Sequence, residues 1–364
     1  MSSTTSITIV PPGGVVGILG GGQLGRMLAL SAARLGLDVH VFAPEADCPA
    51  SRVSAKCWTA PYDDEVALLE FANSCDVITF EFENIPAKSL EAIADAGKQV
   101  FPRPSALAVS QDRLIEKQFL QSINVPPVSF EAIDDASQIA KALDRLGGKG
   151  ILKLRREGYD GKGQARIETG CDADAVFAQL GGRECLLEAF IAFDKEISVL
   201  VARGQDGATA IYEPPCNDHG GGILRQSTVP SGMSSAILAK AEQLGLKLAQ
   251  ALDYVGILAL ELFVMPDGTL YANEFAPRVH NSGHWTDDAC YVSQFEQHIR
   301  AVCGWPLGPT MRHSDVVMDN LLGDRDIASW NQRAAAGEAV RIYAKRGGGE
   351  GRKLGHANRM SPKG

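Results

Sequence analysis

Two apolar segments that each carry a glutamate constrain the fold of this chain most. Residues 258–264 read Leu-Ala-Leu-Glu-Leu-Phe-Val, residues 270–274 read Leu-Tyr-Ala-Asn-Glu, and Met-Pro-Asp-Gly-Thr joins them. The four polar loop residues predict an antiparallel hairpin, closed between the methionine and the leucine that flank the loop. In that register Glu261 lies directly opposite Glu274, with Cβ atoms about 4.5–5.5 Å apart.

Two carboxylates at this separation repel each other, and the apolar flanks add a desolvation cost. A divalent cation removes both penalties, and Mg²⁺ takes oxygen ligands while it shares its coordination sphere with nucleotide phosphates. We therefore predict that Glu261 and Glu274 are metal ligands. The alternative is a solvated strand face with two glutamates, and a register change of one residue would place them on opposite faces.

The first hundred residues alternate short apolar runs with helical patterns, which is typical of a parallel, doubly wound sheet. The loop Gly20-Gly-Gly-Gln-Leu-Gly25 joins the first strand to the first helix, where backbone amides favour a phosphate. NAD is disfavoured because the second strand ends in Phe-Ala-Pro without an acid. The alternative is a tight turn with no ligand. The expected strands are 15–20, 39–42, 76–79 and 99–101, and the expected helices are 23–35, 86–96 and 105–122.

A smaller α+β unit and a longer antiparallel unit should follow, giving domains 1–112, 113–204 and 205–364. In the central domain we expect helices at 135–146 and 172–180 and strands at 128–130, 151–154, 164–168, 185–188 and 196–201. In the last domain we expect a helix at 234–252, strands at 208–213, 223–229, 257–264 and 269–275, and a strand or two in the tail 310–364.

A basic, glycine-rich loop runs from Lys153 to Gln164 between two predicted strands. It is not a phosphate-binding P-loop, because it opens no helix and lacks Gly-Lys-Ser/Thr. We predict a flap whose amides and cations cover a triphosphate, although an ordinary exposed hairpin is the alternative.

Two further segments gather donors. Arg278, His280, Asn281 and His284 follow the second glutamate strand closely, and Arg and His suit a small oxyanion. The alternative for these histidines is a structural role. The second segment, residues 345–356, is basic and glycine-rich, and its alternative is a frayed polar tail.

Composition excludes several classes of protein. The formal charge is −9, from 35 lysines and arginines against 44 aspartates and glutamates, so we expect no binding to nucleic acid or membrane. The eight cysteines have no Cys-x-x-Cys spacing, which indicates core thiols in a reducing compartment. Residues 1–8 do not resemble a secretory signal, and no apolar run approaches the ~20 residues of a membrane span. We expect a cytoplasmic protein.

A flap between antiparallel strands, followed by paired acidic strands, resembles the ATP-grasp superfamily. Within it, six segments spread over residues 15–357 resemble the N5-carboxyaminoimidazole ribonucleotide synthetases of purine biosynthesis. They are 20–27 (Gly-Gly-Gly-Gln-Leu-Gly-Arg-Met), 79–86 (Thr-Phe-Glu-Phe-Glu-Asn-Ile-Pro), 111–113 (Gln-Asp-Arg), 159–164 (Tyr-Asp-Gly-Lys-Gly-Gln), 273–286 (Asn-Glu-Phe-Ala-Pro-Arg-Val-His-Asn-Ser-Gly-His-Trp-Thr) and 351–356 (Gly-Arg-Lys-Leu-Gly-His).

This resemblance implies an ATP-grasp fold of the α/β and α+β classes, with a Rossmann-like N-terminal domain. It implies that ATP and Mg²⁺ or Mn²⁺ drive the carboxylation of 5-aminoimidazole ribonucleotide by bicarbonate through carboxyphosphate. We expect a stand-alone, homodimeric ligase. The alternatives are another purine ATP-grasp ligase that uses formate or glycine, and a non-catalytic nucleotide sensor.

The resemblance also implies roles for individual residues. Nucleotide binding falls to Arg113, Lys153, Tyr159, Asp160, Gly161, Lys162, Gly163, Gln164, Glu188, Ala189, Phe190, Ile191, Glu196, His219, Asn273 and Glu274. Catalytic contacts to bicarbonate, carboxyphosphate or the amine fall to Asp160, Arg278, His280, Asn281, Lys345 and Arg352. The residues that bind the ribonucleotide are Gly22, Gln23, Leu24, Glu81, Glu83, Tyr159, Arg352 and Lys353. The metal carboxylates are Glu261 and Glu274.

Overall fold

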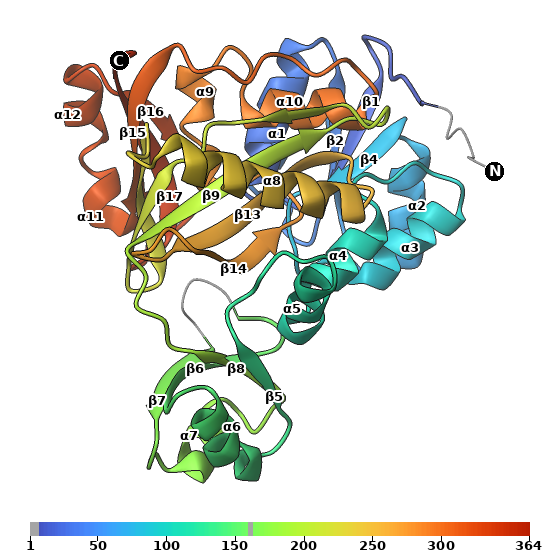
Figure 1. The fold of residues 1–364 in the computed structure, drawn as a ribbon. Helices are drawn as coiled ribbons and strands as arrows, with labels where there is room; N and C mark the ends of the chain where they lie inside the picture. The colour runs from blue at the N-terminus through green and yellow to red at the C-terminus, as the bar shows by residue number, and fades with distance from the viewer. Residues whose placement is uncertain (1–6, 159–162) are drawn as a thin grey trace.

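The structure, a computed structural model, describes residues 7–158 and 163–364. Sheets organise it into a parallel unit, a small antiparallel unit and a large antiparallel unit, in chain order (Figure 1). This succession confirms the predicted fold class. No helix in the described part of the chain is long and apolar enough to cross a membrane.

The N-terminal unit is a parallel sheet with the strand order β3-β2-β1-β4. Strands β1 and β4 are buried almost throughout, as expected for parallel strands covered on both faces. The strand predicted at 99–101 is wrong, because only a single bridge joins Val100 to Ile78. The sequence analysis missed β3 and α2. The elements are β1 (Val15–Leu19), α1 (Gln23–Arg34), β2 (Asp38–Ala43), η1 (Ser51–Val53), β3 (Lys56–Thr59), α2 (Glu65–Asn73), β4 (Val77–Phe80) and α3 (Ala87–Asp95).

The single helix predicted at 105–122 is instead two helices, α4 (Pro104–Ser110) and α5 (Arg113–Ser122). Asp112 between them has an extended backbone, and its side chain accepts from the amides of Leu114 and Ile115. This N-cap satisfies amides that would otherwise lack partners, so it starts a new helix.

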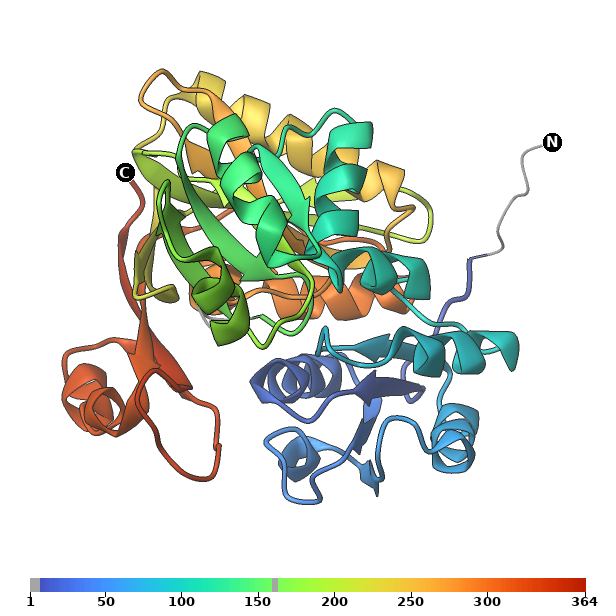
Figure 2. The same ribbon diagram turned by 90° about the horizontal axis from the view of Figure 1, so that it is seen from below.

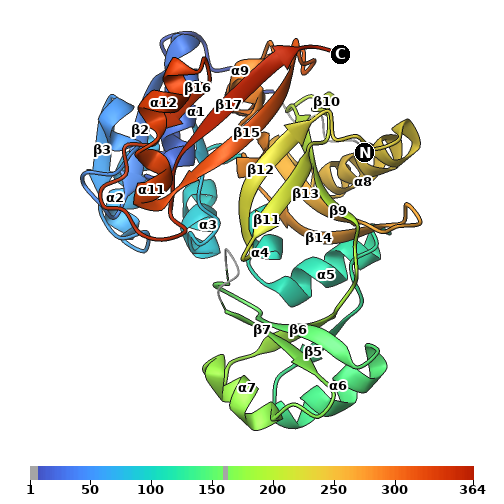
Figure 3. The ribbon, with the colours of Figure 1, turned by 90° about the vertical axis from the view of Figure 1, so that its left-hand side faces the viewer.

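The central unit is an antiparallel sheet with the order β5-β8-β6-β7. Helices α6 and α7 cover the sheet face that points away from the rest of the molecule (Figure 3). Its elements are β5 (Phe130–Ile133), η2 (Ala136–Gln138), α6 (Ile139–Arg145), β6 (Lys149–Leu154), β7 (Gln164–Glu168), α7 (Ala173–Gln179) and β8 (Cys185–Ala189).

The strand predicted at 196–201 forms as β9 (Lys195–Arg203), but its placement in the central unit is wrong. It pairs over its whole length with β13 (Gly256–Val264) in the large sheet, whose order is β14-β13-β9-β11-β12-β15-β17-β16. Alternate β9 residues face two cores, one with α8 and one with α10. Ile197, Val199 and Val201 lie in the first core, and Leu200 and Ala202 lie in the second.

The predicted strands and the long helix of this unit form close to their predicted bounds, but the sequence analysis missed the polar strand β11 and the helices η3, α9 and α10. The elements are β10 (Thr209–Ile211), β11 (Cys216–Gly220), β12 (Ile223–Val229), α8 (Ser235–Ala251), β14 (Leu270–Ala276), η3 (Asn281–Gly283), α9 (Thr286–Ala289) and α10 (Gln294–Val302). The tail holds more structure than predicted: β15 (Ser314–Leu322), α11 (Gly323–Ile327), α12 (Trp330–Ala335), β16 (Ala339–Ile342) and β17 (Lys353–Pro362).

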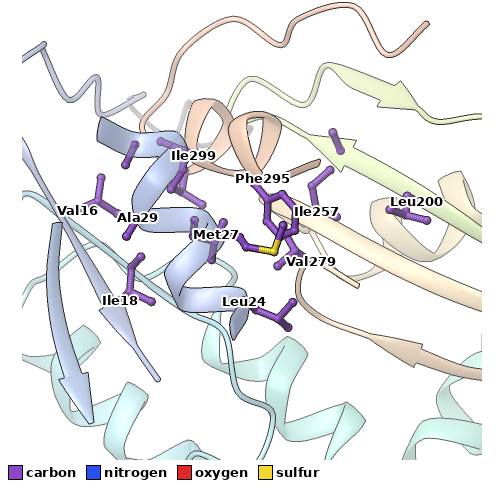
Figure 4. Close-up of a cluster of buried hydrophobic side chains, with 14 of the residues drawn as sticks. Val16, Ile18, Leu24, Met27, Ala29, Leu200, Ile257, Val279, Phe295 and Ile299 are labelled. Carbon is purple, nitrogen blue, oxygen red and sulfur yellow. The ribbon is translucent and has the colours of Figure 1, made fainter. Parts of the chain in front are cut away.

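Helix α1 joins the parallel unit to the large sheet. Its apolar face lies between β1 and α10, and Met27 and Phe295 point toward each other there (Figure 4). Buried His298 on α10 bonds to Thr79 Oγ1 at 2.8 Å and accepts from the amide of Ile257 at 3.1 Å. Burial lowers the pKa of His298 to about 3, so the ring is neutral. These contacts fix the ends of β1 and β4 beside the large sheet.

Candidate active site

The glycine-rich loop lies where the strand order of the parallel sheet reverses, which is the usual ligand position in such folds. Parallel pairing of β1 with β4 brings Gly20 beside Glu81. Gly20 has φ of 112°, and a Cβ there would lie 2.6 Å from the Glu81 side chain. The amide of Gly22 donates to Glu81 Oε1 at 2.7 Å. One amide that the sequence analysis offered to a phosphate is therefore bonded to an internal carboxylate.

Glu81 is buried, and burial raises its pKa against the opposing effects of the Gly22 amide and Arg278. Arg278 itself donates from Nε to Glu83 Oε2 at 2.6 Å. Burial lowers the pKa of Arg278, but Glu83 outweighs burial and raises it. The acids after β4 and the arginine after β14 thus form one charged group between the parallel and large sheets. Helix α1 starts at Gln23, directly after the Gly22 amide that bonds to Glu81, whereas Leu24 is buried in the apolar core with Met27.

The glutamate hairpin forms as β13 and β14, but the predicted register is wrong by one residue at the loop. Val264, and not Met265, faces Leu270, because the amide of Met265 donates to the carbonyl of Thr269 at 2.9 Å. The loop therefore contains one residue more than predicted, Met265, on the β13 side.

A β-bulge restores the predicted proximity. The register shifts between Leu260 and Leu262, so that Glu261 alone on β13 faces two residues of β14, Asn273 and Glu274. The two glutamates are neighbours because of the bulge and not because of simple pairing.

The oxygen atoms at this bulge fit a divalent cation. Asn273 Oδ1 is buried and lacks a hydrogen-bond partner, and Glu261 Oε1 lies 3.0 Å from His280 Nε2. In the described residues no cluster of three or more His, Cys, Asp or Glu could hold a metal by itself. This donor set suits Mg²⁺, which usually binds one or two carboxylates and completes its sphere with phosphates and water.

Arg113, the first residue of α5, connects this bulge to the flap. Its guanidinium donates to Glu274 Oε2 at 2.6 Å and to the carbonyl of Gly158 at 3.0 Å. Burial raises the pKa of Glu274, but Arg113 outweighs burial and lowers it to about 2. Glu274 is therefore ionised at neutral pH, as a metal ligand must be.

A buried carboxylate between two lysines holds the central sheet against α5. Glu188 on β8 is 3% exposed. Its Oε2 accepts from Lys153 at 2.7 Å, and its Oε1 lies 3.1 Å from Lys117 Nζ. Burial raises the pKa of Glu188, but Lys117 and Lys153 outweigh burial and lower it to about 2.

The sequence analysis missed Lys117 and its neighbour Glu116, both buried on α5. Lys117 also donates to the carbonyl of Asn273, and Glu116 accepts from the amide of Phe275 at 2.6 Å. Burial and then the charge of Glu274 raise the pKa of Glu116 to about 8. A usable signal was present, because Arg113, Glu116 and Lys117 are spaced i, i+3 and i+4 on one helical face.

Glu196 and His219 meet across the pairing of β9 with β11. Their side chains approach to 2.5 Å between Oε2 and Nδ1. A register shift between Asp218 and His219 turns the histidine at the end of β11. Burial lowers the pKa of His219, but the contact with Glu196 outweighs it and raises the pKa.

Two of the proposed oxyanion residues start polar chains in the large sheet. His280 Nδ1 lies 2.8 Å from Ser282 Oγ, which accepts from Ser198 at 2.6 Å. Asn281 exchanges side-chain hydrogen bonds with Asn320 at 2.9 and 2.6 Å. His284 is separate: it is fully buried against Gln294, so it has the structural role that was the alternative.

The basic C-terminal loop contacts the N-terminal unit, and both lie on one side of the molecule (Figure 2). Arg346 pairs with Asp47. Arg352 donates to the carbonyls of Arg346 and Gly347 at 2.7 and 2.8 Å, while Lys345 lies over the Tyr343 ring. Lys353 begins β17. The loop is therefore an ordered connection and not the frayed tail that was the alternative.

The remaining predicted residues divide into two groups. Gly163, Gln164, Ala189, Phe190 and Ile191 lie at the ends of β7 and β8, where the Leu154 amide donates to the Gly163 carbonyl and the Phe190 amide donates to Lys149. Tyr159, Asp160, Gly161 and Lys162 lie outside the described residues.

Comparison with known proteins agrees with this geometry. A family model described as an ATP-grasp domain matches residues 118–295, and one described as a ribonucleotide synthetase preATP-grasp domain matches residues 14–111. The N5-carboxyaminoimidazole ribonucleotide synthase of Brucella melitensis is 49% identical over 359 residues, which cover 98% of this chain and 99% of the relative.

Two solved structures are similar over nearly the whole chain. The N5-carboxyaminoimidazole synthetase of Staphylococcus aureus with ADP has a TM-score of 0.92 at 36% identity and covers 97% of this chain and 95% of its own. The Aspergillus clavatus synthase with ADP and 5-aminoimidazole ribonucleotide has a TM-score of 0.88 at 28% identity and covers 96% and 94%. The chain belongs to the N5-carboxyaminoimidazole ribonucleotide synthase family, a family of ATP-grasp ligases.

Proposed function

We propose that this protein uses ATP and bicarbonate to carboxylate the exocyclic amine of 5-aminoimidazole ribonucleotide. The products are N5-carboxyaminoimidazole ribonucleotide, ADP and phosphate, with carboxyphosphate as the intermediate. The proposal rests mainly on the bulge, where Glu261 faces Asn273 and Glu274. The cations Arg113 and Arg278 lie next to these residues. A triphosphate and a small oxyanion need this combination of charges side by side.

The residues on the nucleotide side bind and orient the phosphates. Arg113 and Lys153 are cations that now pair with Glu274 and Glu188, so both are positioned before a nucleotide binds. We assign Glu196 to accept hydrogen bonds from the ribose hydroxyls. Mg²⁺, when held by Glu261 and Glu274, would neutralise charge on the transferred phosphoryl group.

The residues on the oxyanion side hold bicarbonate and then carboxyphosphate. The planar guanidinium of Arg278 presents donors in pairs, which matches a carboxylate-like anion. Arg278 lies between Glu81 and Glu83 on one side and Glu274 on the other, so its charge acts on both the ribonucleotide site and the nucleotide site. His280 and Asn281 add donors from the segment that follows Arg278.

A coupled assay of ADP release tests the proposal. ADP formation should depend on bicarbonate and increase with 5-aminoimidazole ribonucleotide, while formate and glycine should not replace bicarbonate. If ADP forms equally fast without either co-substrate, the assignment as a carboxylating ligase is wrong.

Four finer points belong to the same proposal. The metal is Mg²⁺, with Mn²⁺ as a substitute, which ADP release after metal removal and readdition tests. The protein works as a homodimer, which light scattering tests. It acts in the cytoplasm, which fractionation tests. The domain limits 1–112, 113–204 and 205–364 stay predictions for limited proteolysis, although β9 pairs with strands beyond the second limit.

A further inference from the structure

Asp112 has no role in the proposed chemistry, although its side chain is only 1% exposed. It lies directly before Arg113 and caps α5, where its Oδ1 accepts from the amides of Leu114 and Ile115. A helix cap needs a single side-chain oxygen, so it does not account for the second oxygen or for the charge.

The carboxylate of Asp112 also binds two arginines that follow β6. Arg155 donates from Nε to Oδ1 at 3.1 Å and from Nη2 to Oδ2 at 2.8 Å, which is the strong two-point geometry of an arginine–carboxylate pair. Arg156 Nε lies 3.3 Å from Oδ2. Burial raises the pKa of Asp112, but Arg155 outweighs burial and lowers it. An ionised Asp112 thus ties the start of α5 to the residues that begin the predicted flap.

Two further contacts connect Arg113 to the same segment. The amide of Arg113 donates to the carbonyl of Arg155 at 2.9 Å. The Arg113 guanidinium donates to the carbonyl of Gly158 at 3.0 Å. On the other side, Lys153 of β6 lies two residues before Arg155. The contact between Asp112 and Arg155 therefore lies between the two cations that we assign to the nucleotide phosphates, Arg113 and Lys153.

We propose that Asp112 is a positioning residue that fixes Arg113 relative to Lys153 through its contact with Arg155. The ligand of these two cations rests on the proposed function, whereas the contact itself does not. Arg113 comes from α5 and Lys153 from the central sheet, so their separation depends on what joins these elements. Glu188 joins them one turn further along α5, which leaves the first turn of the helix to Asp112. A displacement near 1 Å between groups that hold one ligand is enough to weaken their action strongly.

The substitution Asp112→Asn separates this role from helix capping. Asparagine caps a helix about as well as aspartate, so the start of α5 is kept while the charge that binds the arginines is lost. Arg155 keeps its contact with Glu184 at 3.2 Å, so the variant should fold, which far-ultraviolet circular dichroism checks. Asp112→Ala loses the cap as well and should have a lower urea midpoint than Asp112→Asn, with the same affinity for nucleotide.

Titration calorimetry with ADP measures the effect on binding. We expect Asp112→Asn to raise the Kd for ADP about 10- to 100-fold. Arg155→Met keeps the apolar stem and removes the same contact, so it should raise the Kd to a similar degree. The double variant should bind no more weakly than either single variant, because both remove one interaction. The control Glu131→Gln breaks a more exposed contact with Arg145 at the edge of the same sheet and should leave the Kd unchanged.

The possible outcomes separate the two proposals. If Asp112→Asn binds ADP as tightly as the parent, or more tightly because the released arginines attract phosphate, the positioning proposal is wrong. It is also wrong if the effects of Asp112→Asn and Arg155→Met add in the double variant. If the parent does not bind ADP, the proposed function is wrong instead. Hydrogen exchange at the Arg113 amide then decides the positioning role, since exchange should be faster in Asp112→Asn, and an unchanged rate would overturn it.

Discussion

The buried carboxylate of Glu188 gives the sharpest stability prediction. The substitution Glu188→Gln keeps the size of the side chain and removes its charge. Lys117, fully buried, and Lys153 would then face each other without the anion that separates them. We expect a large loss of stability, because two cations would share a site from which water is largely excluded.

The pKa shift of Glu188 and the usual cost of breaking a buried ion pair predict a similar loss of stability. The pKa of Glu188 falls from the ordinary 4.5 to about 2, which corresponds to about 3 kcal/mol at ~1.4 kcal/mol per pKa unit. Removal of one partner from a buried ion pair typically costs about 3–5 kcal/mol. We therefore expect Glu188→Gln to lower the free energy of unfolding by about 3–5 kcal/mol at neutral pH.

Urea unfolding without nucleotide measures this loss, and the chain supplies a matched control. Glu168 on β7 of the same sheet pairs with Lys149 at 3.7 Å, but both side chains are about 70% exposed. Glu168→Gln should change the free energy of unfolding by less than about 1 kcal/mol, because solvent screens exposed pairs.

The dependence on pH provides a second check. A carboxylate whose folded pKa is lowered stabilises the fold above its unfolded pKa, and this contribution is lost as pH falls toward the folded value. The advantage of the parent over Glu188→Gln should therefore decrease between pH 4.5 and about 2. A Gln variant as stable as the parent at neutral pH would refute the reasoning.

Three other substitutions have defined outcomes. Glu274→Gln should lower kcat by about 100-fold or more with an unchanged far-ultraviolet circular dichroism spectrum, and an unchanged kcat would exclude a metal role. The parent should lose stability as the pH rises from 4.5 to about 8, because in that range only the unfolded chain releases the Glu116 proton. Glu116→Gln should remove this loss, which urea midpoints measure. Glu196→Gln should lower the pKa of His219 measured by NMR titration, and an unchanged value would contradict their pairing.

The parts of the fold that depend on local patterns were predictable from the sequence. β12 and β7 begin and end at the predicted residues, because glycine or proline lies close to both ends of each strand. β11 was missed, since Cys-Asn-Asp-His-Gly has no apolar pattern and is a strand only through its neighbours. The break at Asp112 was also missed, because aspartate fits both a helix interior and a cap.

The sheet to which a strand belongs was not predictable in the same way. β9 follows the small sheet in the sequence, and its apolar pattern fits either unit. Its assignment depends on pairing with β13, more than fifty residues later in the chain. Such long-range pairing is set by tertiary packing and leaves no local signal.

The candidate site shows the same division between residue types and geometry. The paired glutamates were predictable from composition, since carboxylates in apolar strands need a cation. Their actual arrangement depends on the bulge at Glu261, beside which Lys117 and Glu116 of α5 bond to the backbone of β14. Lys117 was missed because a helical lysine is usually exposed, and its burial is accounted for by contacts with Glu188 and the Asn273 carbonyl, which come from distant parts of the chain.

The assigned cations and acids of the site are already paired with one another. Arg113 binds Glu274, Lys153 binds Glu188, and His280 contacts Glu261. A metal at the two hairpin carboxylates must compete with Arg113 and His280, and phosphates at Arg113 must compete with Glu274. Each ligand therefore frees the group that the other one needs, so binding of the metal and of the phosphates is coupled favourably. Charge pairing in this site lowers the affinity for either ligand alone and favours the two together.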